Sequence, residues 1–133
     1  MFSIEMAVRD YELDALGIVH HSRYLQYFEH ARNQFLLTLG ESFPKLAADG
    51  HQLVVSALQV RYISPLCTED RFVIQTVPRL EGRVRMVFDQ VLTKAGQTTP
   101  AATAAVTVIA IKPNGRPYLP DFFSRFLSKE SKS

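Results

Sequence analysis

The chain has 133 residues, of which 47% are apolar and 21% charged, which suits one ordinary domain with a continuous core. Fifteen basic and thirteen acidic residues leave a formal net charge of +2, which is too small by itself to indicate nucleic-acid binding. The single cysteine excludes an intrachain disulfide, and the chain has neither a signal-peptide pattern nor ~20 consecutive apolar residues, so we expect a cytoplasmic protein without a membrane or nucleic-acid partner.

The first third of the chain predicts a strand, a loop and a long helix. Phe2 to Val8 alternates in the period of a half-buried strand, and Asp10 to Gly17 then breaks the pattern as a loop. From Arg23 to Leu39 apolar side chains recur at helical spacing over most of the girth, which predicts a helix buried on more than one side. Ser22 is the expected N-cap and Gly40 the expected stop.

The rest of the chain predicts a short helical piece over 41–49 and then mainly strands. Pro78 is expected to end its strand or to lie on a sheet edge. Short turns between the later strands imply antiparallel pairing, and one long buried helix against such a sheet makes an α+β domain of two layers. The domain is expected over 1–128, ending in a short helix over 121–127, with a frayed tail over 129–133. The expected strands are Gln52–Tyr62, Arg71–Val77, Arg83–Thr93 and Ala101–Ile111.

The densest group of functional side chains lies between Asp10 and His21, just before the predicted long helix. A carboxylate in such a loop can act as a base or a nucleophile. The N–H groups at the start of a helix can hold a developing oxyanion. Acyl transfer requires both elements, although acidic loops before helices are also common without any catalytic role.

A sequence motif adds to this interpretation. Asp14-Ala15-Leu16-Gly17-Ile18-Val19, with Tyr24 at the helix start, resembles the signature of the 4-hydroxybenzoyl-CoA thioesterase family of hotdog proteins. The stretches 24–32 and 61–66 look like the family's helix and next strand, and the resemblance extends from Val8 to about Pro120. The stretches 8–14 and 61–66 also look like the plastid acyl-lipid thioesterases, which release fatty acids from acyl carrier protein. The resemblance implies a hotdog fold, a curved antiparallel sheet wrapped around one long central helix.

The resemblance also implies catalytic residues. Asp14 matches the family's catalytic aspartate, which would attack the thioester carbonyl directly or act as a base for water. His21 stands where the family places a backbone N–H that polarises the carbonyl oxygen, and its imidazole could orient water or assist the leaving group.

Four further residues complete the candidate site as substrate-binding positions: Gly17, His20, Arg23 and Tyr24. Tyr24 is interpreted mainly as structural, and His20 can point into the site or to solvent. Arg23 stands where many relatives carry Asn, so it could reach a carboxylate, pantetheine or phosphate of the substrate. We favour the alternative that Arg23 is a solvated residue of the first helical turn.

The implied function is hydrolysis of an acyl-CoA or acyl-[acyl carrier protein] thioester to a free acid and a thiol. No metal is expected, because the sequence has no carboxylate-histidine spacing of a zinc site. No other cofactor is expected either, and CoA or phosphopantetheine enters as part of the substrate. The family dimerises through its sheets with each active site at the subunit interface, and we expect a homotetramer. Arg79, Arg83 and Arg85 could grip CoA phosphates or an acidic carrier protein, although a solvated hairpin is the favoured interpretation.

Two alternatives stay open at this stage. The first is a non-catalytic acyl-binding protein of the same fold, because fold alone does not establish function. The second is a hotdog dehydratase, although the segment from Asp14 to Tyr24 does not look like dehydratase motifs. The acyl chain and the choice between CoA and carrier protein are not revealed by the sequence.

Overall fold

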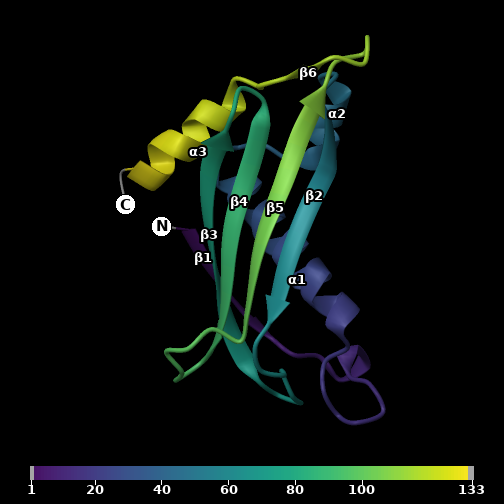
Figure 1. Cartoon of the computed structure of the whole chain (residues 1–133), viewed down its shortest axis with the longest axis vertical. Helices are drawn as coiled ribbons and strands as arrows, with labels where there is room; N and C mark the ends of the chain where they lie inside the picture. The colour runs from purple at the N-terminus through teal and green to yellow at the C-terminus, as the bar shows by residue number, and fades with distance from the viewer. Residues whose placement is uncertain (1, 132–133) are drawn as a thin grey trace.

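The computed structural model describes residues 2–131, and side chains within 2–127 (Figure 1). One sheet runs in the spatial order β1-β3-β4-β5-β2, every neighbouring pair is antiparallel, and β6 adds to β5. The strands are β1 (Phe2–Ala7), β2 (Gln52–Tyr62), β3 (Arg71–Glu81), β4 (Arg85–Lys94), β5 (Ala102–Ile111) and β6 (Pro117–Tyr118). The helices are the 3-10 helix η1 (Asp10–Glu12) and the α-helices α1 (His21–Thr38), α2 (Phe43–Ala48) and α3 (Phe122–Ser131).

The long helix α1 lies across one face of this sheet, as Figure 1 shows, and its aromatic face forms the centre of the core. Tyr27, Phe28 and Phe35 are each only 1% exposed. Phe35 stacks on Phe2 of β1 and meets Phe126 of α3 edge-on. Because rings of this size carry much of the apolar area of a small domain, α1 holds the sheet edge and the C-terminal helix to one core. The predicted α+β hotdog architecture is confirmed.

A buried polar network also ties α1 to the sheet. The Arg32 guanidinium donates to Gln90 Oε1 of β4 at 3.0 Å, and Gln90 Nε2 donates to the Phe28 carbonyl and to Thr76 Oγ1 of β3, each at 3.0 Å. All three side chains are buried. Buried polar groups are costly unless they are hydrogen-bonded, so this network fixes the rotation of α1 relative to β3 and β4.

Several predicted boundaries are corrected. The N-cap of α1 is His20 rather than Ser22, because His20 Nδ1 accepts the Ser22 N–H. Leu25 and Leu37 of α1 are exposed, so within one chain the helix is buried on one broad side only. The loop after β1 contains the short helix η1, and the sequence analysis predicts neither η1 nor β6.

Pro78 does not end its strand, and β3 continues to Glu81. Within the described residues the pairing of β1 with β3 reaches Thr76, so Pro78 lies beyond the part of β3 that β1 covers, which agrees with the expected edge position. At the other end of the chain, α3 continues to Ser131, beyond the expected end at residue 127 and into the expected tail. Residues 132 and 133 of that tail lie outside the described part. Among the helices of residues 2–131, none has the length and apolar character needed to cross a membrane.

The core position of Phe35 gives a stability prediction. Phe35→Ala removes a ring that is 1% exposed and leaves a cavity between β1 and α3, so the free energy of unfolding should fall by about 3–5 kcal/mol. Leu37→Ala on the same helix is the matched control, because Leu37 is 54% exposed and its loss should cost less than about 0.5 kcal/mol. Urea denaturation of both variants measures the difference, and equal losses would contradict this placement of the core.

Candidate active site

The turn that carries Asp14 is held by its own side chain. Asp14 Oδ1 accepts the N–H groups of Leu16, at 2.8 Å, and Ile18, at 3.3 Å, while the Gly17 N–H donates to the Asp14 carbonyl at 3.1 Å. Gly17 has a φ of +79°, which only glycine adopts at little cost, so the turn depends on glycine there. Within the described residues no donor reaches Oδ2 of Asp14, so one carboxylate oxygen remains available for chemistry.

Helix α1 begins directly beside this turn. His20 caps the helix, accepting from the Ser22 N–H at 3.2 Å, and its Nδ1 also lies 2.8 Å from Ser22 Oγ. His21 is the first helical residue, so its N–H has no intrahelical carbonyl to bond and carries part of the positive end of the helix dipole. The two imidazole rings lie 4.3 Å apart at their centroids. Among residues 2–131 no backbone carbonyl accepts from this N–H, so the start of the helix places an unengaged donor next to two imidazoles.

The opposite wall comes from the end of β2 and the loop that follows it. The Leu66 N–H donates to Tyr24 Oη at 3.0 Å, and the Val19 N–H donates to the Leu66 carbonyl at 2.8 Å. Tyr62, the last residue of β2, donates its hydroxyl to the His21 carbonyl at 3.0 Å. These bonds join segments more than 40 residues apart in sequence. Burial raises the pKa of the Tyr24 phenol, which keeps it a neutral part of this wall.

The two walls enclose an open pocket of about 350 Å³. Asp14, His20, His21 and Tyr24 line it, so the structure brings together four of the six site residues predicted from sequence. The other lining residues are Ile18, Val19, Tyr62, Ile63, Ser64 and Pro65.

The other two predicted residues do not line this pocket. Gly17 shapes the turn instead, and the Arg23 guanidinium donates to Gln26 Oε1 at 3.0 Å, which agrees with the solvated alternative. Tyr62 was not singled out by the sequence reasoning, although it lies in the quoted 61–66 stretch. Only the pairing of β2 in space brings it opposite His21, and a lone tyrosine at a strand end carries no local signal of this contact.

A pocket of this chemistry can be compared with known proteins. The thioesterase superfamily model matches residues 16–101, which is more than half of the chain. The chain belongs to the thioesterase superfamily. The match begins after Asp14, so it does not by itself assign a role to that residue.

Relatives of this thioesterase-superfamily chain include a chloroplastic acyl-acyl carrier protein thioesterase, ATL3 of Arabidopsis thaliana, with 32% identity over 86% of the chain and 60% of the relative. The acyl-CoA thioesterase YbgC of Haemophilus influenzae is 30% identical over 81% of the chain and 80% of the relative. A crystal structure of a hypothetical protein from Aquifex aeolicus superposes with a TM-score of 0.85 at 30% identity, covering 96% of this chain and 99% of the other. The chain spans about three fifths of the length of the Arabidopsis relatives.

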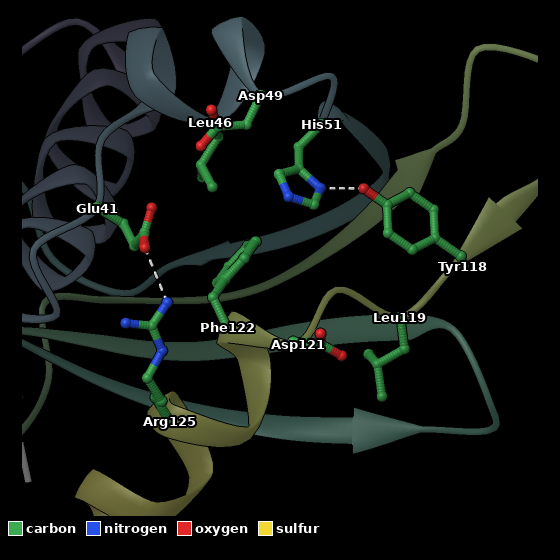
Figure 2. A pocket seen from close by; sticks show the side chains of 9 residues that line it. All are labelled: Glu41, Leu46, Asp49, His51, Tyr118, Leu119, Asp121, Phe122 and Arg125. Carbon is green, nitrogen blue, oxygen red and sulfur yellow. Dashed lines mark hydrogen bonds and ion pairs between the residues drawn. The ribbon is translucent and has the colours of Figure 1, made fainter.

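The thioesterase-superfamily chain has a second pocket, of about 310 Å³, at the other end of α1. Figure 2 shows its two polar pairs, Glu41 with Arg125 at 2.8 Å and His51 with Tyr118. The first pair holds the pKa of Glu41 below its ordinary value. Glu41, between α1 and α2, is thereby tied to α3, and His51, just before β2, is tied to β6, so His51 is a structural histidine here.

Two other expectations concern ligands of this superfamily member. Arg79 is bonded to Asp89 at 2.6 Å and to Glu81 at 3.2 Å, and its hairpin lies at the far end of the sheet from the Asp14 turn (Figure 1). The basic cluster is therefore a partly neutralised hairpin, remote from the pocket within one chain.

Among the described residues, no three His, Cys, Asp or Glu side chains gather in a way that could hold a metal ion.

A buried carboxylate supports the loop that carries Asp14. Glu12, 5% exposed, accepts the Tyr27 hydroxyl and the Arg9 N–H at 2.8 Å each, which joins the loop to α1. Burial, followed by the hydrogen bond to Glu12, raises the pKa of Tyr27 above its usual value. The sequence reasoning did not select Glu12, because an acidic residue in a polar loop gives no sign of its burial.

This raised pKa predicts a pH dependence of stability. The unfolded chain loses the Tyr27 proton near pH ~10, whereas the folded chain keeps it, so the free energy of unfolding should fall as the pH rises above ~10. At a pH where the unfolded chain has lost this proton and the folded chain has kept it, Tyr27 lowers the free energy of unfolding by about 1.4 kcal/mol per pH unit. Urea unfolding of wild type and Tyr27→Phe between pH 9 and pH 11 compares the slopes, and the variant should have the shallower one. Identical slopes would show that Tyr27 ionises equally in both states.

Proposed function

We propose that this protein is a thioesterase that hydrolyses an acyl thioester to a free acid and a thiol, with Asp14 as its catalytic carboxylate. The observation that carries the proposal is the pocket in which Asp14 faces the start of α1. A carboxylate with one unengaged oxygen beside an unengaged helix N–H combines the two groups that acyl transfer needs. Membership of the thioesterase superfamily supports the reaction class, thioester hydrolysis.

The chemistry can follow two balanced routes. In the first, Asp14 Oδ2 attacks the thioester carbonyl carbon, the C–S bond breaks, the thiolate takes a proton, and water hydrolyses the resulting mixed anhydride. In the second, Asp14 takes a proton from water, the hydroxide attacks the same carbon, and the thiol leaves with that proton. In both routes the His21 N–H stabilises the carbonyl oxygen as it becomes negative. His20 and His21 line the pocket and are positioned to bind water or the sulfur leaving group. Neither route requires a metal or redox cofactor.

The donor is proposed to be an acyl group on CoA or on the phosphopantetheine of an acyl carrier protein. One relative is named an acyl-CoA thioesterase and another an acyl-acyl carrier protein thioesterase. Both kinds of donor carry the acyl group as a thioester of pantetheine, which is the chemistry that they share. The pocket has an apolar wall of Ile18, Val19 and Ile63, which suits the carbons next to the thioester.

A homotetramer is proposed for the assembly, with dimers formed through β2. Within the described part of the chain this strand pairs with β5 alone, so its other edge is open there over 11 residues. The edge strand and the residue after it expose large apolar side chains: Val54, Val55, Leu58, Tyr62 and Ile63 are each 39–49% exposed. A long apolar edge strand is a template for pairing, and a second copy of β2 would continue the sheet beside the pocket.

Asp14 variants test the chemistry. Asp14→Asn keeps the oxygen that accepts from Leu16 and Ile18 but removes the charge, so kcat should fall by about 10²–10⁴ while the fold is retained. Asp14→Ala should lose turnover with near-normal folding. Asp49→Asn is the matched control, because Asp49 is exposed and lines only the second pocket. Thiol release is measured with an acyl-CoA series, and an Asn variant that keeps most of its activity would refute the role of Asp14.

Light scattering after size exclusion tests the assembly. Wild type should elute with the mass of four chains, and Leu58→Lys should disrupt the dimer because it places a charge on the apolar edge strand. Gln75→Lys, on an exposed β3 position, is the control and should leave the mass unchanged. A monomeric wild type would contradict the proposal. A dimeric wild type that Leu58→Lys turns into a monomer would refute the tetramer but support β2 as the dimer contact.

An acyl-binding protein without turnover is the second candidate function. The specific observation in its favour is that the pocket alone would hold an acyl thioester whether or not Asp14 reacts. Binding of an acyl-CoA without thiol release by wild type would select it.

A further inference from the structure

We propose that Tyr62 is a positioning residue for thioester hydrolysis, holding the first turn of α1 in the geometry that the reaction needs. The proposal rests on the proposed function above. It begins with a hydrogen bond between residues 41 positions apart: Tyr62 Oη donates to the carbonyl oxygen of His21 at 3.0 Å. That carbonyl shares its peptide group with the Ser22 N–H, which in turn donates to His20 Nδ1. The Tyr62 hydroxyl therefore bonds the peptide between His21 and Ser22, the first peptide of α1, whose N–H bonds the His20 ring.

The Tyr62 ring adds an orientation to this bond. The ring stands edge-on to the His21 imidazole, with the ring centroids 6.3 Å apart and the ring planes at 90°. It also stands edge-on to the Tyr24 ring, with a centroid distance of 5.1 Å and an interplanar angle of 89°. Edge-to-face contacts of this kind have a preferred geometry, so the ring limits the positions of the imidazole. Tyr62 is thus the point at which β2 touches the catalytic segment through both its hydroxyl and its ring.

The contact belongs to a reciprocal connection between the two walls of the pocket. Tyr24 of α1 accepts from Leu66 in the loop after β2, while Tyr62 at the end of β2 donates to His21 at the start of α1. The Leu66 carbonyl accepts from Val19 as well. Of these three bonds between the walls, the one from Tyr62 falls on the peptide next to the proposed oxyanion donor.

The exposure of Tyr62 separates positioning from stability. Within one chain Tyr62 is 47% exposed, unlike Tyr24 at 3%, so Tyr62 contributes little to the core of the subunit. Removing its hydroxyl should hardly change the thermal midpoint, but it frees the first turn of α1 to shift. Small displacements at a reacting centre are expensive, because catalysis depends on closely fixed geometry.

Tyr62→Phe keeps the ring and removes the hydroxyl, and it is the decisive variant. We expect kcat for a hydrolysed acyl-CoA to fall by about 3- to 10-fold, with KM unchanged and the thermal midpoint within about 3 °C of wild type. Tyr62→Leu also removes the ring contact with His21, so its kcat should fall further than that of Tyr62→Phe. Tyr11→Phe is the matched control, because Tyr11 is 65% exposed and does not line the pocket. An unchanged kcat would overturn the proposal, and so would a raised KM alone, which would indicate a contact with substrate.

A second measurement needs no turnover. The amide nitrogen of Ser22 reports hydrogen bonding at the His21 carbonyl, because the two belong to one peptide group. In ¹H–¹⁵N spectra, Tyr62→Phe should shift the Ser22 and His21 amides while leaving the remote amides of α3 in place. Spectra without these shifts would overturn the proposal. If wild type releases no thiol but the shifts appear, the proposed function fails while the contact with the helix start stands.

Discussion

Burial of the aromatic face of α1 against the sheet is the interaction on which the rest of the structure depends. Tyr27, Phe28 and Phe35 can leave water only beneath the curved strands, and the bonds of Gln90 to Phe28 and Arg32 then fix how the helix is rotated. With the helix fixed, its first turn lies beside the end of β2. The pocket is a consequence of this placement, since neither the Asp14 turn nor the strand end forms it alone.

Polar contacts convert this proximity into a defined site. Glu12 is buried and bonded to Tyr27, so the loop before the helix is anchored two residues before Asp14. Asp14 uses one oxygen to close its own turn and keeps the other unengaged within the described chain. The His21 N–H at the start of α1, which has no partner among residues 2–131, completes the pair. Structure and chemistry thus share the same residues in this loop.

The sequence predicted what depends on period and motif, and it missed what depends on packing in space. The sequence predicts β2 with its observed bounds, because Gly50 before it and its content of Val and Leu are local signals. The N-cap was wrong, since serine is the usual choice and only the structure shows that His20 accepts from Ser22. Glu12 and Tyr62 were not selected, because burial and a contact across 41 residues leave no local trace.

Superfamily membership and fold leave the reaction itself to experiment, because related folds also serve as binding proteins. The most direct measurement is thiol release by the purified wild-type protein with aliphatic, 3-keto and aromatic acyl-CoAs and an acyl carrier protein series, with free acid quantified in parallel. The account predicts equal amounts of thiol and acid from at least one donor. Saturable binding of these donors without release of either product would contradict it.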